Sequence, residues 1–402
     1  MTTQRKCRYI LASMAFVSLI VFQPFEPAFA QLPVLFPSQI IEAPADTPPD
    51  VTSDQARFGR YVSIDGDTAV IGVTSARAAY IYSKNRQGDW VYRTRLEIPE
   101  PHSGLHGVEL SGDIALVAAQ TQAALGAVFV FQRRNGNWKL VQTLLPAPGD
   151  GSMGYGDAID FDGRTAVVSA AWDRRAVYVY TRSEHGPFTL TTTLEPNPPM
   201  TPSAFGASLA IDGRTILVGD TAAGPSSAGA TYVFEKHGQD WMLAQALLAS
   251  DGEFNDMFGN SVALKGRIAV IGALRDGAQS QDHTGSVYIF VRHGQSWSED
   301  AKLTNPTNGT FGWPVVTDGK RVFAVAGAFT EQPEGPRMAA AFEYRRASGS
   351  WTAMRILSPP EPSVEWGHDI DISRELLLTG NQDVNTEDPV FDGQAYEYRL
   401  RR

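Results

Sequence analysis

The residues best suited to acid–base chemistry in this 402-residue chain are scattered along it. His368, Asp369 and Asp371 form the tightest imidazole and carboxylate cluster, and we expect strand alternation to place Asp369 opposite the other two. The sequence carries neither the nucleophile elbow of serine hydrolases nor the H-E-x-x-H motif of zinc proteases. Asp157 and Asp369 remain as a candidate carboxylate pair for glycoside chemistry, which needs a separation of about 5 to 10 Å.

Oxygen ligands suited to a cation gather near the end of the chain. Within a dozen residues stand Asn381, Asp383, Asn385, Glu387, Asp388 and Asp392. Of these, Asp383, Asn385, Glu387 and Asp388 are the candidate metal ligands, and a sparser pair, Asp276 and Asp282, occurs earlier. Calcium takes roughly six to eight oxygens, but solvated acidic loops have the same composition. Both interpretations stay open.

Seven copies of one sequence unit must position these residues. The clearest copy runs from Phe258 to Leu303 and holds four β-prone runs joined by short turns such as Lys265-Gly266-Arg267. An aromatic residue followed by glycine marks the start of each copy, with His106-Gly107 as a degenerate case. The marker glycines are Gly59, Gly107, Gly156, Gly206, Gly259, Gly312 and Gly367. An aromatic pair with one residue between follows each mark, which places both rings on one face of a third strand.

The outermost strand of the last copy is missing from its expected place. Six copies end with an aromatic residue followed six residues later by leucine, and the chain stops at Arg402 before a seventh can form. Leu35 and Ile41 have the same separation. We therefore predict an all-β fold, a seven-bladed β-propeller of four-stranded antiparallel blades whose last blade is closed by the N-terminal strand. Residues 34–44 would be the closing strand, 45–57 a linker and 58–402 the repeats.

The first thirty residues (1–30) predict a secretory signal peptide. Basic residues at 5–8 precede an apolar run from Tyr9 to Phe22, and Ala28-Phe29-Ala30 supplies the cleavage site. The run is shorter than the ~20 residues of a membrane span, so we expect cleavage instead of membrane insertion. Residues 31–402 would then form one secreted domain, located outside the cell, in the periplasm or at the cell surface.

Net charge limits the possible binding partners, and cysteine content limits the possible disulfides. The formal net charge of −10 disfavours nucleic acid and anionic lipid surfaces. The only cysteine, Cys7, would leave with the signal peptide, so the mature chain would rely on packing without disulfides. We expect a monomer. Asn308 is a glycosylation acceptor only if the chain passes through a eukaryotic secretory pathway.

The Phe-Gly marks, the Gly-Ala ends of second strands at Ile271-Gly272-Ala273 and Ala326-Gly327-Ala328, and the aromatic third strand together resemble the FG-GAP repeat family. The resemblance covers about residues 34–400 and looks closest to the bacterial secreted branch. It implies the seven-bladed propeller found in the head of the integrin α subunit. That family's calcium loops join the first two strands of a blade. Here this connection is a short turn such as Asp65-Gly66-Asp67, which cannot wrap an ion, so we do not expect calcium there.

One mouth of the central channel is the expected ligand site. The connections between second and third strands are longer in blades four to seven, and they share a face with the Phe-Gly approaches. The residue after each marker glycine should lie at that mouth, and residue type varies there while the strand pattern does not. The candidate ligand-binding residues are Arg60, Asp157, Asn260, Trp313 and His368, with Val108 and Ala207 at the same position in blades two and four.

These expectations favour a secreted, non-enzymatic binding or adhesion protein without a cofactor. It would engage an extracellular protein or glycan with the channel mouth and the long loops of blades four to seven. The alternative is a secreted polysaccharide hydrolase or lyase with carboxylates at the mouth, so catalysis stays open as the second choice. A scaffold module of the cell envelope without a ligand site is a third interpretation.

Overall fold

The computed structural model describes residues 32–44, 58–74, 77–102, 104–121, 125–147, 149–150, 153–172, 174–184, 186–196, 203–277, 285–307, 309–329, 338–382 and 393–400. The predicted signal peptide (1–30) and linker (45–57) lie outside these residues. So do Asp282, Asn308 and the candidate metal ligands Asp383, Asn385, Glu387 and Asp388.

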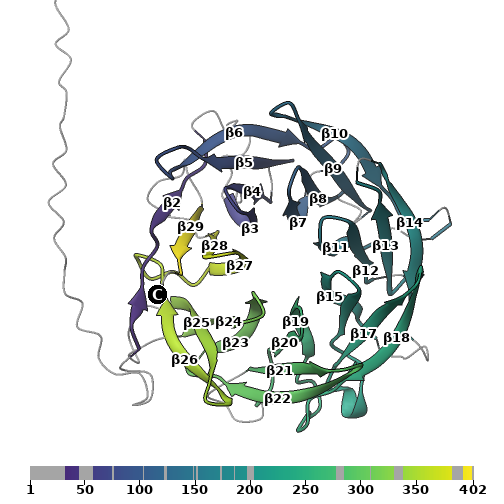
Figure 1. Cartoon of the computed structure of the whole chain (residues 1–402), viewed down its shortest axis with the longest axis vertical. Helices are drawn as coiled ribbons and strands as arrows, with labels where there is room; N and C mark the ends of the chain where they lie inside the picture. Colours follow the sequence, from purple (N-terminus) through teal and green to yellow (C-terminus); the bar gives the residue numbers. More distant parts are fainter. Residues whose placement is uncertain are drawn as a thin grey trace, which may run out of the picture.

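In the described part of the chain, seven antiparallel sheets surround a central channel (Figure 1). Blade one holds β3 (Phe58–Asp65), β4 (Thr68–Val73), β5 (Ala78–Lys84) and β6 (Trp90–Glu97). Blade two holds β7 (Gly104–Ser111), β8 (Ile114–Gln120), β9 (Gly126–Arg134) and β10 (Asn137–Leu144). Blade three holds β11 (Tyr155–Phe161), β12 (Thr165–Ala170), β13 (Ala176–Arg182) and β14 (Phe188–Leu194). Blade four holds β15 (Phe205–Asp212), β16 (Thr215–Asp220), β17 (Ala230–His237) and β18 (Asp240–Leu247).

The remaining blades follow the same order from the channel outward. Blade five holds β19 (Phe258–Lys265), β20 (Ile268–Ala273), β21 (Ser286–His293) and β22 (Ser296–Thr304). Blade six holds β23 (Thr310–Thr317), β24 (Arg321–Phe329), β25 (Met338–Ala347) and β26 (Ser350–Leu357), and blade seven holds β27 (Trp366–Ser373), β28 (Leu376–Asn381) and β29 (Gln394–Arg399). The predicted all-β seven-bladed propeller is confirmed.

The N-terminal segment completes the ring, as predicted, but through two strands. β2 (Gln39–Ile41) pairs antiparallel with β29 and closes blade seven. β1 (Val34–Leu35) pairs parallel with β26 and gives blade six a fifth strand. The expectation that Leu35 belongs to the closing strand is therefore wrong. Pro37 lies between β1 and β2 and has no backbone N–H to donate to a neighbouring strand. The segment is therefore divided into two short strands, one on blade six and one on blade seven.

The Phe-Gly mark is a β-bulge at the start of the inner strand. Six marker glycines have φ between 74° and 91°, a region that side chains disfavour. The pairing register of the inner strand with the second strand shifts at the same place, for example between Phe58 and Tyr61. Blade two carries the degenerate mark, and Gly107 is not among the glycines with positive φ. Its register shift falls between Leu105 and Gly107.

Glycines near the ends of second strands face the marker glycines of the next blade. An added Cβ would lie 2.0 Å from the opposed carbonyl oxygen for Gly219 with Gly259, 2.0 Å for Gly272 with Gly312, and 1.6 Å for Gly380 with Gly59. No side chain fits at such distances, because carbon and oxygen repel each other well outside them. At these three boundaries a glycine near the end of the second strand and the marker glycine of the next blade therefore serve one purpose, which is close approach of two backbones.

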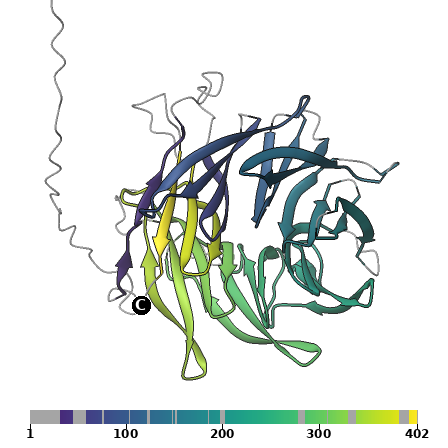
Figure 2. The same ribbon diagram turned by 45° about the horizontal axis from the view of Figure 1, so that its top comes forward.

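Apolar clusters fill the spaces between blades. Seven such clusters occur among the described residues, and each joins two neighbouring blades, as in the one that unites Val287 of β21 with Phe342 of β25. The marker aromatics, such as Phe205 and Trp366, are among the largest fully buried side chains. The tilted view in Figure 2 shows the blades packed side by side around the ring. Burial of this apolar surface between blades is the main stabilising contribution.

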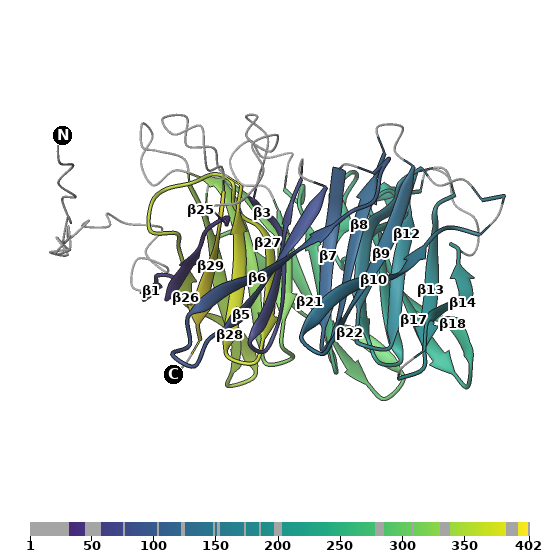
Figure 3. The same ribbon diagram turned by 90° about the horizontal axis from the view of Figure 1, so that it is seen from above.

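The ring has two faces with different connections (Figure 3). We call turn face the side with the hairpins that join the first and second strands and the third and fourth strands. We call loop face the side with the connections from second to third strands and from one blade to the next. The short 3-10 helix η2 (Pro225–Ser227) lies in a loop-face connection. No helix in the described ranges is long and apolar enough to span a membrane.

Candidate binding site at the channel mouth

The inner strands of all seven blades line a channel of about 1100 Å³. Of the predicted mouth residues, Ala207, Asn260 and Trp313 are part of its lining. The Asn260 side chain accepts a hydrogen bond from the Leu274 backbone, so its oxygen already serves its own blade. Val108 is only 3% exposed and lies in the core between blades one and two. The expectation that Val108 reaches the mouth is wrong, because blade two lacks the positive-φ glycine that shifts the other inner strands.

Three predicted ligand-binding residues form a row at the loop-face mouth of blades six, seven and one. The Trp313 and His368 rings meet edge-on at 4.9 Å between centroids, and His368 meets Tyr61 in the same manner at 6.4 Å. The Arg60 guanidinium lies 5.5 Å from the centroid of the Tyr61 ring. Trp313 is 42% exposed, so its indole remains accessible. We call this set, Trp313, His368, Tyr61 and Arg60, the aromatic row.

Arg60 anchors one end of the aromatic row. Its Nε donates to the Tyr61 hydroxyl at 3.2 Å, and its Nη1 donates to Gln382 Oε1 at 2.5 Å. Burial raises the pKa of the Tyr61 hydroxyl, and the Arg60 charge opposes that shift. Tyr61 therefore stays protonated, which suits a contact surface better than a catalytic base.

A second polar cluster lies at the mouth of blades two and three. Asp157 Oδ1 is 3.2 Å from His106 Nδ1 and also accepts a hydrogen bond from Gln120. Trp172 covers the Gly154 backbone, where an added Cβ would lie 2.6 Å from the indole and 2.9 Å from Asp157 Oδ2. Trp172 is 59% exposed. We call Trp172, Asp157, His106 and Gln120 the opposite cluster.

The aspartates of β27 accept hydrogen bonds from the backbone of blade one. Asp369 accepts a hydrogen bond from the Val62 backbone at 2.8 Å, and Asp371 accepts one from the Ile64 backbone at 2.7 Å. Both aspartates thus lie on the side of β27 that faces blade one. The expectation that alternation isolates Asp369 is wrong, because residues two apart share a face and it is His368 that points elsewhere.

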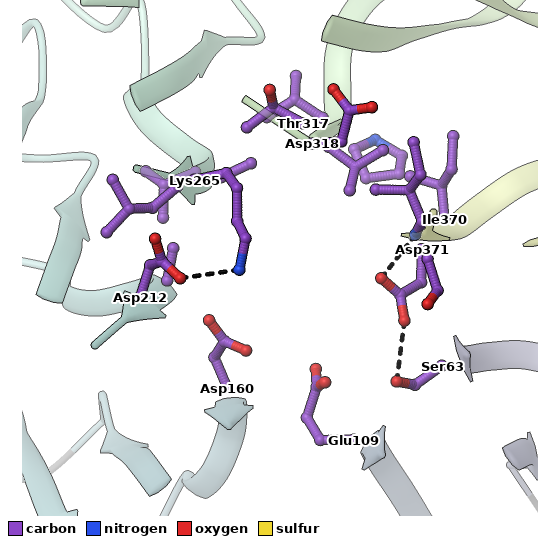
Figure 4. Close-up of a pocket in the computed structure, with 18 of the residues that line it drawn as sticks. Ser63, Glu109, Asp160, Asp212, Lys265, Thr317, Asp318, Ile370 and Asp371 are labelled. Carbon is purple, nitrogen blue, oxygen red and sulfur yellow. Dashed lines mark hydrogen bonds and ion pairs between the residues drawn. The ribbon is translucent and has the colours of Figure 1, made fainter. Parts of the chain in front are cut away.

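Half-buried carboxylates from three blades converge inside the channel (Figure 4). Burial raises the pKa of Asp160 and that of Asp369 to about 7. Burial also raises the pKa of Asp371, and it raises the pKa of Glu109 well above its usual range with help from the neighbouring aspartates. Crowded carboxyl groups with raised pKa values therefore line the channel below the mouth.

The turn-face aspartates link neighbouring blades as well as forming turns. Asp65 accepts from Gly112 N at 2.7 Å, Asp162 accepts from Gly213 N at 3.1 Å, and Asp212 accepts from Gly266 N at 2.7 Å. The Asp-Gly pattern by itself predicts only turns. The repeated Asp-Gly pattern was the signal in the sequence for this role. The pattern does not show that each aspartate bonds a backbone N–H of the next blade.

The described residues hold no group of three or more His, Cys, Asp or Glu side chains with metal-site geometry. Asp276, one of the sparser cation candidates, is instead paired with an ammonium group. Lys302 Nζ lies 2.5 Å from Asp276 and 2.7 Å from Asp251, and the Tyr288 hydroxyl donates to Asp251 at 2.8 Å. These two carboxylates therefore already have an internal cation.

Comparisons with known proteins agree with this architecture. The model of the FG-GAP repeat matches residues 241–290, from β18 into β21. No curated protein matches the chain. A chain in a crystal structure of the mitotic checkpoint complex shares the fold with a TM-score of 0.58, at 10% identity over 100% of both chains, which is a likeness of fold alone. The repeat match and the seven blades together agree with an FG-GAP seven-bladed β-propeller.

Proposed function

We propose that this protein is a secreted, non-enzymatic binding protein that holds an extracellular protein or glycan at the loop-face mouth of its channel. The aromatic row carries the proposal. It joins three predicted ligand-binding residues, Arg60, Trp313 and His368, from three consecutive blades into one strip in which Trp313 is 42% exposed. Such rows combine flat apolar contact area with hydrogen-bond donors, which suits recognition.

The distribution of exposed apolar side chains supports the same face. Eight large exposed hydrophobic residues lie at loop-face positions, namely Leu125, Leu145, Met153, Trp172, Leu248, Phe254, Trp313 and Val364. The other exposed large hydrophobic residues of the described chain belong to outer strands or to the N-terminal segment. Apolar groups that remain exposed on one face of a soluble protein typically mark a binding surface.

Polysaccharide cleavage is the second candidate, and the channel carboxylates support it. A carboxyl with a pKa near 7, such as that of Asp369, can act as a general acid. However, both oxygens of Asp369 accept backbone hydrogen bonds, one from Val62 and one from Ile370. This occupation favours a structural role for Asp369 and supports binding over catalysis.

A binding screen of the secreted chain tests the proposal. The purified chain would be applied to arrays of glycans and of cell-surface proteins, together with Trp313→Ala and His368→Ala. Because the aromatic row contributes contact area and orientation, we expect Trp313→Ala to weaken binding about 10-fold. Met242→Ala, at an outer-wall residue that is 57% exposed, is the matched control and should bind normally.

Two outcomes would contradict the proposal. Unchanged binding in both row variants would exclude the aromatic row as the contact surface. Release of oligosaccharides from any polysaccharide on the array, lost in Asp369→Asn, would establish the enzymatic alternative. Mass spectrometry of the secreted chain tests the compartment, with an expected N-terminus at Gln31.

A further inference from the structure

Two exposed tryptophans stand on nearly opposite sides of the channel. Trp172 belongs to blade three and Trp313 to blade six, and three of the seven steps around the ring separate these blades (Figure 1). They are 59% and 42% exposed. Neither occupies the outer-strand position of the repeat, where tryptophans such as Trp297 pack between blades. These two are therefore free of the packing role that explains the others.

Each of the two tryptophans lies beside hydrogen-bonding side chains. Trp172 is next to Asp157, which also contacts His106. Trp313 contacts His368, the next member of the aromatic row. A flat aromatic surface bordered by polar groups matches the two kinds of surface on a sugar ring, which has an apolar face of C–H groups and a rim of hydroxyls.

We propose that the loop-face mouth binds a linear polysaccharide of neutral sugars, with one sugar on Trp172 and another on Trp313. This rests on the proposed function and specifies its ligand. The Asp157 carboxylate and the Arg60 guanidinium are placed to bond sugar hydroxyls at the two sides. A chain of sugars is specified because the two tryptophans belong to blades that lie three steps apart around the channel.

The charge around the mouth selects neutral sugars over acidic ones. Asp157 lies at the mouth beside Trp172, and the whole chain carries a formal charge of −10. A uronate or sulfated polymer would be repelled by this field, while a neutral polymer would not. Arg60 supplies one positive charge at the rim, which is too little to reverse the sign.

Two contact points predict a dependence on polymer length. A short oligosaccharide occupies one tryptophan, whereas a polymer that reaches both gains from the high effective concentration of its second contact. We expect a neutral polysaccharide to bind at least about 10-fold more tightly, per binding segment, than its own trisaccharide. Loss of either tryptophan should remove most of that difference.

The experiment compares the purified chain with Trp172→Ala, Trp313→Ala and the double variant by affinity electrophoresis and calorimetry. The probes are soluble β-glucan and mannan, their trisaccharides, and the acidic polymers alginate and pectate. Each single variant should lose about 10-fold in affinity for the neutral polymer that binds, and the double variant about 100-fold. Met242→Ala should bind normally, and Trp172→Phe and Trp313→Phe should recover part of the affinity, which separates stacking from misfolding.

Three results would overturn the inference. The first is equal affinity for polymer and trisaccharide, and the second is preference for alginate or pectate. The third is binding of no polysaccharide while a protein ligand is captured in a Trp313-dependent manner, which would leave the proposed function intact. Binding of any ligand that ignores both the aromatic row and Trp172 would overturn the inference and the proposed function together.

Discussion

The two faces of the ring are built from the same seven repeats but differ in regularity. On the turn face, Asp-Gly hairpins recur, and aspartates such as Asp162 and Asp212 bond the next blade in the same manner. On the loop face, the equivalent positions hold residues as different as Arg60, Asp157 and Trp313. The exposed hydrophobic residues are found on this face and on the outer wall.

This difference separates architecture from recognition. The turn face repeats because each hairpin must satisfy the backbone of its own turn and of its neighbour, which leaves little choice of residue. The side chains at the tips of the loop face have no such structural role. The glycines beneath them do, because they allow two backbones to approach closely. Substitutions on the two faces should therefore affect different properties, stability on one side and binding on the other.

The largest expected effect concerns the glycines under the loop face. Gly380→Ala would place a Cβ 1.6 Å from the Gly59 carbonyl oxygen, so the boundary between blades seven and one must open. We expect a loss of at least about 3 kcal/mol in the free energy of unfolding, measured by urea denaturation. The control is Gly266→Ala on the turn face, where φ is +61° but the added Cβ meets nothing within 4 Å.

Gly266→Ala should cost only about 1 kcal/mol, the strain of a side chain at positive φ. Equal losses in the two variants would show that conformational freedom, and not close approach of backbones, explains the repeated glycines.

An intermediate effect should appear in the channel that connects the two faces. The pKa of Asp160 is about 7 in the folded protein against an ordinary value of 3.8, so between these values the folded state keeps a proton that the unfolded state has lost. Stability must then fall as pH rises through this window, on the order of 1 kcal/mol per pH unit for this group. Unfolding by urea at pH 5, 6 and 7 measures the slope.

Asp160→Asn should reduce that slope by the share of one group, because the amide does not titrate, while Asp369, whose pKa is also raised to about 7, keeps its own share. Asp251 and Glu397 titrate below this pH window. Burial raises the pKa of each carboxyl, but a hydrogen bond from a lysine partner outweighs burial and leaves the pKa lowered. A slope that is the same in the variant would mean that Asp160 is charged at neutral pH.

The smallest effect sharpens the comparison within one inner strand. Asp162→Ala on the turn face removes the acceptor of the Arg164, Thr165 and Gly213 backbone N–H groups, and should cost about 1.5 kcal/mol. Asp157→Ala, at the other end of β11, removes side-chain partners only and should cost roughly 0.5 kcal/mol while weakening ligand binding. The assignment of roles to the two faces would fail if the order of stability losses were reversed.

Local features of the sequence predicted most of the fold. Alternating β-prone runs, two-residue turns and the Phe-Gly mark are each readable without knowing the partner strand. The missing seventh outer strand also predicted that the N-terminal segment returns to the last blade, which β2 confirms. The assignment of Leu35 to that strand failed because Pro37 divides the segment, a local signal that the repeat pattern obscured.

The binding site was less accessible to such reasoning. Arg60, Trp313 and His368 were named from their common position after a marker glycine, but nothing in the sequence connects them to Tyr61 or to one another. Trp172 was missed because it occupies no repeated position, and His106 was noted only as part of a degenerate marker. Only the ring brings them beside Asp157.

The sequence by itself determined the repeat, the number of blades and the closure by the N-terminal segment, because turn residues and alternation act over a few neighbouring positions. The tertiary structure alone decided which aspartates link blades, which acids crowd the channel and which aromatic rings meet at its mouth. These contacts join residues of different blades, and their distances depend on how seven twisted sheets pack around one axis.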